Sequence, residues 1–313
     1  MFVLRILQTT NKFLVRLMEQ NRRINESFSY LTMLLMIFFL SIAKAGNNGK
    51  IVFVQDGIGE LQKSEKQIAI NFWDDYFNKR TKNYSVSSSV TSIDKFMKHL
   101  DGGKIDYVLL DGSNYIQYYH RLEPNLTDEA WLVQRTEHSF EEFVLLVRQE
   151  TNIDHFRQLR NTVFSLHSGY GLLRLYLEQL VLKTSNMSIT DYFKEIRDAK
   201  TESQAILDVY FSNSDACVVA KHVFDDAIEL NPAIKEKIKI IQRTERIYAP
   251  AIYLALNGVS KQGQQNFSRG VDMLNNTIRG RQILDLFGIH IIKRIDPKKL
   301  QPMLQQNIAW RKY

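Results

Sequence analysis

Apolar and polar positions along this chain alternate between short buried runs and longer amphipathic stretches. Residues 51–54 form a continuous apolar run that stops at Gln55, Asp56 and Gly57, which is typical of a strand buried in a parallel sheet. Residues 64–80 carry apolar side chains three to five positions apart, which predicts a helix with one buried face. The alternation continues and predicts strands at 51–54, 84–90 and 105–110 and helices at 64–80, 92–100 and 113–119, with Ser92 as an N-cap.

The same pattern restarts after residue 141. It predicts strands at 142–147, 162–166, 238–242 and 248–256, helices at 153–159 and 172–182, further alternating elements between 191 and 227, and one long helix at 262–286. Two successive α/β units without a Pro-rich or Ser-rich linker predict two lobes, each a mainly parallel sheet flanked by helices, with a cleft between them. We assign residues 46–142 and 251–313 to lobe one and residues 143–250 to lobe two.

The N-terminal part of the chain carries an apolar run at 30–42 that is too short to span a bilayer comfortably. Arg22 and Arg23 precede it, and the small-x-small exit Ala43-Lys44-Ala45 follows it. These features predict a signal peptide at 1–45 with cleavage after Ala45, and hence a protein exported from the cytoplasm. The alternative is an uncleaved anchor, and Met18 is an alternative start that would give a leader of ordinary length.

Charge and composition narrow the range of functions. The formal net charge is +7, but six basic and two acidic residues among the first 45 account for +4 of it, which leaves +3 for the rest. Such a weak field favours neither nucleic-acid binding nor a polybasic membrane protein, and it is compatible with an anionic small ligand. The lone cysteine, Cys217, lies in an apolar run and is expected to be buried; no intramolecular disulfide is possible.

Sequence motifs predict no cofactor and no metal. The histidines lack H-x-x-x-H and H-E-x-x-H spacing, and Gly57-Ile58-Gly59 lacks the third glycine of a dinucleotide site. No G-x-S-x-G motif or assignable Ser-His-Asp set is present, so we expect no catalysis. An enzyme that uses Asp111 or His167 is the rival hypothesis, which turnover assays would test.

Three strand ends supply the candidate ligand-binding residues, because ligands of open parallel sheets bind at the carboxyl ends of strands. They are Asp56 after the first strand; Asp111, Gly112, Ser113 and Tyr115 after the third; and His167, Ser168, Gly169 and Tyr170 before the helix at 172–182. The last loop is the best anion candidate, since free N–H groups at a helix start, the helix dipole and Ser168 all favour negative charge. Two alternatives stay open: an ordinary N-cap for this loop, and a turn or core role for Asp111 and Tyr115.

Four segments resemble a known family in their order and spacing. They are KIDYVLLDGSNYIQYY at 104–119, IDHFRQLRNTVFSLHSGY at 153–170, AILDVYFSNSDACVVAKHVF within 201–224, and the tail at 287–311. Together they are similar to the periplasmic solute-binding proteins of ABC importers, in the phosphate/phosphonate-binding branch of the type 2 fold. Where that family has a Ser/Thr-rich loop, this chain has only His167-Ser168-Gly169, and Asn161 stands where the family commonly has glycine.

The resemblance implies a periplasmic, monomeric, non-enzymatic protein that closes about a hinge on a small phosphate- or phosphonate-like ligand. It implies a membrane partner, which is the permease of an ABC importer or, alternatively, a sensor in a signalling system. The reduced Ser/Thr loop leaves a further alternative, an interaction module whose cleft is vestigial.

Overall fold

The computed structural model describes residues 47–54, 63–80 and 84–308. Within these ranges the strands form two sheets. The first has the order β11-β4-β10-β3-β1-β2 and the second β7-β6-β8-β5-β9. The chain leaves the first sheet after β4 and returns to it with β10. Strand bounds are β1 Asn47–Val54, β2 Tyr84–Thr91, β3 Tyr107–Asp111, β4 Leu126–Gln134, β5 Phe143–Arg148, β6 Val163–Leu166, β7 Glu195–Asp198, β8 Ala216–Ala220, β9 Ile238–Arg243, β10 Ala251–Leu256 and β11 Ile291–Ile295.

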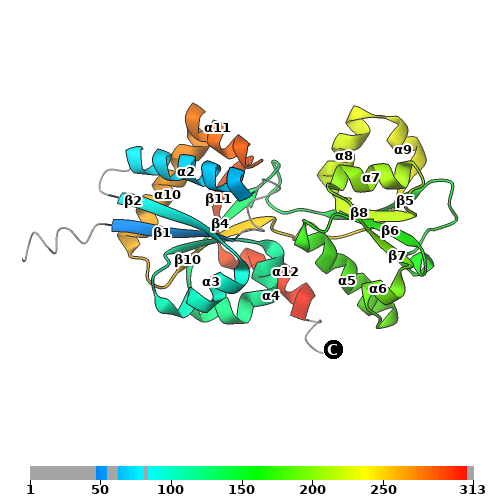
Figure 1. Ribbon diagram of the computed structural model, residues 1–313, viewed down its shortest axis with the longest axis horizontal. Helices are drawn as coiled ribbons and strands as arrows, with labels where there is room; N and C mark the ends of the chain where they lie inside the picture. The colour runs from blue at the N-terminus through cyan, green and yellow to red at the C-terminus, as the bar shows by residue number, and fades with distance from the viewer. Residues whose placement is uncertain (1–46, 55–62, 81–83, 309–313) are drawn as a thin grey trace, which may run out of the picture. The chain divides into compact units, whose positions relative to one another are not determined.

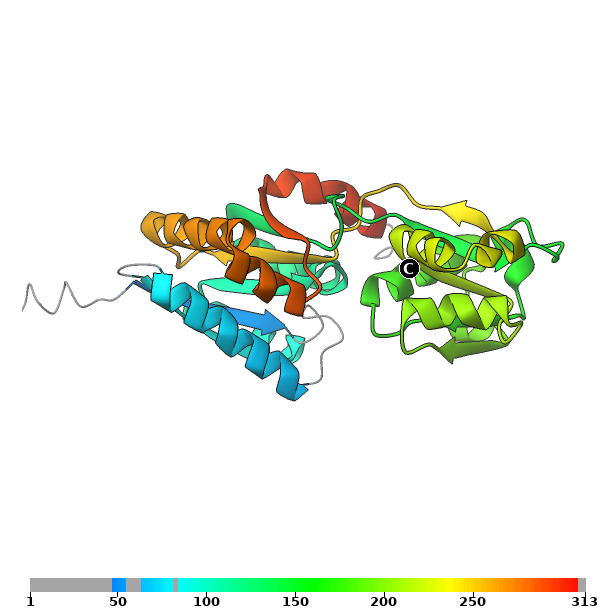
Figure 2. The ribbon, with the colours of Figure 1, turned by 90° about the horizontal axis from the view of Figure 1, so that it is seen from above.

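Helices cover both faces of each sheet. In the first sheet, α2, α10 and α11 lie on one face and α3, α4 and α12 on the other (Figure 1). Figure 2, the view from above, shows α2, α10 and α11 on the near side of that sheet. In the second sheet, α7, α8 and α9 share one face and α5 and α6 the other. Helix bounds are α2 Lys63–Arg80, α3 Ile93–His99, α4 Gly112–Leu122, α5 Gly171–Ser185, α6 Ile189–Tyr192, α7 Glu202–Tyr210, α8 Lys221–Leu230, α9 Ala233–Lys237, α10 Lys261–Asn276, α11 Ile278–Leu286 and α12 Gln301–Ile308, with 3₁₀ turns η2 Leu100–Gly102, η3 Glu123–Asn125, η4 Phe156–Leu159 and η5 Pro297–Leu300.

The α/β class predicted from the sequence is confirmed, and both sheets are mixed. Parallel pairing joins β1 to β3 and joins β6 to both β7 and β8. The pairs of β10 with β3 and β4, of β11 with β4, and of β5 with β8 and β9 are antiparallel, where a mainly parallel sheet was expected. For β10 the reason is the chain path: this strand enters the first sheet on the return from the second, and runs opposite to β3 and β4.

Strand β3 shows why the sheets are buried on both faces. All five of its residues are buried. Side chains of a strand point alternately to its two faces. Val108 and Leu110 accordingly pack in the core with α3 and α4, whereas Tyr107 and Leu109 pack in the core with α2 and α10. The Tyr107 ring stacks on Phe267 of α10 with centroids 4.1 Å apart.

The predicted single helix at 262–286 is wrong, because Thr277 divides it into α10 and α11. Thr277 has extended backbone (φ −114°, ψ 151°) and caps α11, its hydroxyl oxygen accepting the Gly280 N–H at 3.0 Å. A Cβ on Gly280 would overlap the backbone of Leu274, so glycine lets the first turn of α11 pack against the end of α10. The apolar periodicity continues across the break, which is why it suggested one helix.

Removing this cap is expected to destabilise the protein. Thr277→Ala should lower the free energy of unfolding by about 0.5–2 kcal/mol, as loss of a hydroxyl N-cap does elsewhere. Ser92→Ala is the matched control, because Ser92 occupies the N-cap position of α3 as predicted but makes no side-chain cap hydrogen bond. Urea denaturation of both variants checks this; equal losses would show that the Thr277 cap has no special weight.

Cys217 lies in the middle of β8 and is fully buried, as its apolar surroundings predicted. It packs in the core formed with α7 and α8, among residues that include Ile206 and Phe224. Burial raises the pKa of the Cys217 thiol well above its ordinary value, and the nearby Asp208 and Glu202 carboxylates raise it further. The thiol is therefore a packing group, held in its unreactive protonated form.

Candidate functional site

Asp111 ends β3 and is the N-cap of α4. Its carboxylate accepts hydrogen bonds from the backbone N–H of Asn114 at 2.9 Å, from the Ser113 hydroxyl and from the Asn114 side-chain amide. Asp111 is buried, and an acidic side chain at a helix N-terminus is favourable because it pairs with free N–H groups and the helix dipole. Its oxygens are thus already engaged by the first turn of its own helix.

The loop after β6 holds the candidate residues His167, Ser168 and Gly169. The His167 ring is buried, with Nδ1 3.0 Å from the Ala199 carbonyl oxygen. A Cβ on Gly169 would lie 2.7 Å from Cε1 of this ring, so the loop closes tightly over the imidazole only with glycine there. His167 is therefore fixed by its neighbours on both sides.

Ser168 is exposed and contacts a carboxylate that sequence reasoning missed. Its hydroxyl donates to Oδ1 of Asp198 at 2.5 Å, and its backbone N–H lies 3.4 Å from the same oxygen. Asp198 is the last residue of β7, the neighbour of β6 in the sheet. The partner lies 30 residues away in sequence. Only the parallel pairing of β6 with β7 brings them together, so no local motif signals it.

Helix α5 begins at Gly171 without a side-chain cap. Its N-cap residue is Tyr170, which makes no side-chain cap hydrogen bond, so the ordinary Ser N-cap that the sequence left open is not what the structure shows. The Leu173 N–H donates to the Tyr170 carbonyl oxygen at 3.1 Å, and the donors ahead of it at this uncapped helix start are left for water or a ligand. Combined with the dipole of a 15-residue helix, they form an environment that attracts anions.

The starts of α4 and α5 lie against each other. A Cβ on Gly171 would overlap the Ser113 hydroxyl, and a Cβ on Gly112 would overlap the Ala249 carbonyl and lie 2.9 Å from Cδ1 of Leu172. The structure thus brings together the two candidate strand ends at Asp111 and at His167. Asp56, at the remaining strand end, lies outside the described residues.

Two charged residues beside this loop were not predicted, Glu141 and Arg135. The Tyr170 hydroxyl donates to Glu141, which is 6% exposed, and the other carboxylate oxygen, Oε1, has no hydrogen-bond partner in the described part of the chain. The Arg135 guanidinium lies 4.8 Å from the centre of the Tyr170 ring. Burial, followed by the Glu141 charge, raises the pKa of Tyr170 well above its ordinary value, so Tyr170 is a neutral donor.

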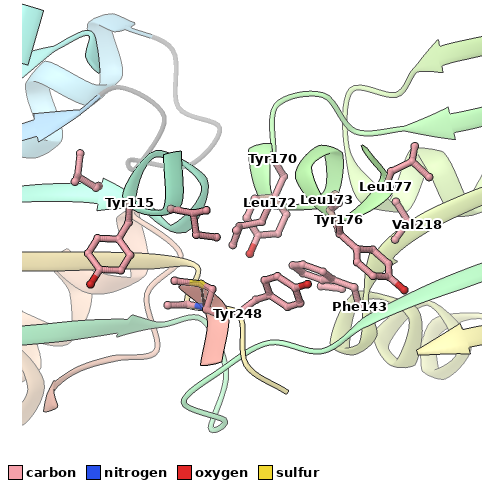
Figure 3. Packing of buried hydrophobic residues seen from close by; sticks show 14 of the residues in the cluster. Tyr115, Phe143, Tyr170, Leu172, Leu173, Tyr176, Leu177, Val218 and Tyr248 are labelled. Atoms are coloured by element: carbon pink, nitrogen blue, oxygen red, sulfur yellow. Dashed lines mark hydrogen bonds between the residues drawn. The ribbon is translucent and has the colours of Figure 1, made fainter. Parts of the chain in front are cut away.

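Tyr115 lies in the core. It is 2% exposed, and its ring meets Tyr119 edge-on with centroids 5.5 Å apart. Figure 3 shows it with other buried side chains of the same core, among them Phe143, Tyr170 and Tyr248. The sequence left two roles open for Tyr115, a ligand contact or a core residue, and its burial is that of a core residue.

Two segments cross between the sheets and are paired. Glu141 and Tyr248 form an antiparallel bridge, with the Glu141 N–H 2.7 Å from the Tyr248 oxygen and the Tyr248 N–H 3.3 Å from the Glu141 oxygen. The Tyr248 ring stacks on Phe143 at the start of β5, with centroids 4.5 Å apart (Figure 3). Because Glu141 also accepts from Tyr170, the paired crossing is tied directly to the loop before α5.

The described residues contain neither a metal-binding cluster nor a membrane-spanning helix. Among them, no group of three or more His, Cys, Asp or Glu side chains is arranged to hold a metal ion. None of the helices in this part of the chain combines the length and apolar character needed to cross a bilayer.

The chain is similar to proteins of a known family. The model of the family described as "ABC transporter, phosphonate, periplasmic substrate-binding protein" matches residues 64–300. A search of curated proteins gives no significant match.

Solved structures with the same fold include three from bacteria. PhnD1 from Prochlorococcus marinus, in complex with methylphosphonate, is 16% identical, with 86% of this chain and 100% of that one covered and a TM-score of 0.57. A binding protein component of an ABC phosphonate transporter from Pseudomonas aeruginosa is 13% identical, with 85% and 87% covered and a TM-score of 0.56. A Xanthomonas citri protein bound to ATP is 13% identical, with 85% and 98% covered and a TM-score of 0.58.

At these identities the structural matches show the fold alone, and the family match extends over most of the chain. The resemblance found in the sequence is confirmed, and so is the type 2 binding-protein fold that it implied. The chain belongs to the family of periplasmic substrate-binding proteins of phosphonate ABC transporters.

Proposed function

We propose that this protein binds a small phosphonate- or phosphate-like anion at the adjoining starts of α4 and α5 and delivers it to the permease of an ABC importer. The observation that carries the proposal is the uncapped N-terminus of α5, next to the Ser113 hydroxyl. Backbone N–H groups and hydroxyls are the donors that a phosphonate's oxygens require. The complex of PhnD1 with methylphosphonate supports this ligand class.

The lobes of our proposal are residues 46–142 with 251–313, and residues 143–250. The ligand binds one lobe first and gains contacts from the other as the protein closes about the paired crossing at Glu141 and Tyr248. The proposal keeps the other site residues predicted from the sequence. They form or flank the same three strand ends and are His167, Ser168, Gly169, Tyr170, Gly112 and Asp56. We place the protein in the periplasm after removal of residues 1–45, as a monomer without catalytic activity.

One observation favours a second function. The Asp198 carboxylate takes both the hydroxyl and the N–H of Ser168, which are donors that an anion would use. If the hydrogen-bond donors of this loop are all taken within the protein, the protein would act through its surface instead, as the partner of a membrane sensor. In that case no small anion would stabilise it.

A thermal-shift titration with methylphosphonate, inorganic phosphate and a sulfonate separates the two functions. A ligand at about 100 times its dissociation constant stabilises the folded state by roughly 2.7 kcal/mol, which is a shift of several degrees in Tm. Ethanol and methylamine serve as uncharged and cationic controls. A shift with a phosphonate or phosphate alone supports the importer function. No shift with any of the anions contradicts it and favours the sensor partner.

A further inference from the structure

A cavity of about 510 Å³ lies in the first sheet's part of the chain, between the edge strand β2, the start of β1 and helix α3. Lys50 and Ile105 line it where β1 and β3 begin, whereas Asp111 ends β3. The cavity therefore lies toward the ends at which β1 and β3 begin, whereas the site at Asp111 lies where β3 ends. Its volume is within the range of ordinary small-ligand pockets.

The cavity walls combine an apolar floor with basic residues. Val52, Phe96 and Ile105 contribute apolar surface. Lys50, Lys95, Lys98, Lys104 and His99 are the basic residues of the lining, and no aspartate or glutamate is among the lining residues. An apolar cavity with a few convergent polar groups is the usual form of a ligand site.

The four lysine side chains make no ion pair or hydrogen bond within the part of the chain that the structure describes. Asp106, the carboxylate nearest in sequence to Lys104 and Ile105, accepts the backbone N–H of Lys50 at 2.7 Å instead. Lys95 and Lys98 are one turn apart on α3, so their ammonium groups lie on the same side of the helix. Like charges gathered around one hollow repel one another, and a bound anion would relieve that repulsion.

Edge strand β2 adds neutral donors to the same walls. Ser87, Ser89 and Thr91 alternate along it, so their side chains point to one face, and all three line the cavity. The hydroxyl donors and the ammonium groups together exceed what one carboxylate can accept. A phosphate monoester, with close to two negative charges and three terminal oxygens, makes fuller use of them.

We propose that this cavity is a second ligand site, which binds an organic phosphate with its phosphate among Lys95, Lys98 and Lys104 and its apolar part against Phe96 and Ile105. The phosphate would be that of a soluble ester or of a phospholipid headgroup, which share this chemistry. The site is independent of the proposed function at α4 and α5.

Lysine footprinting tests this at the residues concerned. The purified protein is acetylated with and without phenyl phosphate, and the rate at each lysine is read by mass spectrometry. At about ten times the dissociation constant, acetylation at Lys95 and Lys98 should slow about tenfold, because only the free sites react. Lys235 and Lys299, which are exposed and lie elsewhere, should be unaffected. Phenol, which lacks the phosphate, should protect none of these four lysines. The proposal is overturned if Lys95 and Lys98 are acetylated at the same rates with and without phenyl phosphate.

Charge-reversal variants give a second readout. Lys95→Glu with Lys98→Glu should weaken phenyl phosphate binding at this site by about 100-fold, since two charged contacts are lost. Lys235→Glu with Lys299→Glu carries the same change in net charge and should bind as the parent does. Unchanged binding stoichiometry and affinity in the first variant would assign the binding to the α4 and α5 site instead and refute the second site.

Co-sedimentation with phosphatidylglycerol and with phosphatidylcholine vesicles distinguishes a lipid headgroup from a soluble ester. If the parent protein binds vesicles and only the Lys95→Glu with Lys98→Glu variant loses that binding, the ligand is the lipid headgroup. If the parent protein binds no vesicles but phenyl phosphate still protects Lys95 and Lys98, the ligand is the soluble ester.

Discussion

Asp198→Asn is expected to bind methylphosphonate about tenfold more tightly than the parent protein, because the change removes a negative charge next to the ligand's anionic group. Asp198 holds the Ser168 hydroxyl at 2.5 Å and so competes with an incoming anion for the same donor. The gain in affinity should be no larger, because Asp198 is exposed and water and salt screen its charge. Isothermal titration at two salt concentrations measures the effect, which should be larger at low salt.

Ser168→Ala is expected to change the affinity for methylphosphonate in the opposite direction. Loss of one hydrogen bond to a charged ligand should weaken binding by about tenfold. Asp285→Asn, which makes the same charge change at an exposed position of α11, is the control and should leave the affinity unchanged. Weaker binding of methylphosphonate by Asp198→Asn would mean that the carboxylate orients Ser168 for the ligand, and would contradict the competition between Asp198 and the anion.

Gly112→Ala should lower the free energy of unfolding by about 1–3 kcal/mol, as overpacking in a well-packed interior does. The added methyl would overlap the Ala249 carbonyl, which is backbone and cannot rotate away, and would press on Leu172. The Gly112 N–H also donates to the Pro250 oxygen at 3.2 Å, so the crossing segment would have to move with it. The variant should therefore lose ligand affinity as well as stability.

Gly102→Ala is the matched control for this change. A Cβ at Gly102 meets nothing within 4 Å, so alanine there should leave stability nearly unchanged. The loss of stability in Gly171→Ala should lie between those of Gly112→Ala and Gly102→Ala. The atom that the added methyl meets first is the Ser113 hydroxyl oxygen, and that side chain can rotate away. Urea denaturation of the three variants gives the ranking; a Gly112→Ala protein as stable as Gly102→Ala would show that the close contact at Ala249 is not restrictive.

The sequence predicts the fold well where buried strands are continuous apolar runs. Strands β1, β3 and β5 were identified from such runs. The family resemblance rested on the order of four segments, of which only the one at 104–119 contains one of these strands, β3. β4 was not predicted, because three successive residues of its first half, Thr127 to Glu129, are polar and at most partly buried. β11 was also missed, since this edge strand alternates too weakly to stand out from the tail.

The site was predictable only in part. Asp111 and the loop at His167 follow apolar strands, and the rule for strand ends found both. The residues that decide their chemistry, Asp198 and Glu141, were not found, because each acts through a contact with a residue about 30 positions away in sequence. Such contacts follow from the pairing of strands and from the crossing segments, which carry no local signal.

The buried thiol of Cys217 has a practical consequence for measuring closure. The chain has one cysteine, and its side chain is inaccessible and held protonated in the folded protein. Maleimide dyes or nitroxide spin labels attached to two engineered surface cysteines, one in each proposed lobe, would therefore meet no competing native thiol. Interlobe distance distributions with and without ligand then become accessible by spectroscopy without first deleting a core residue.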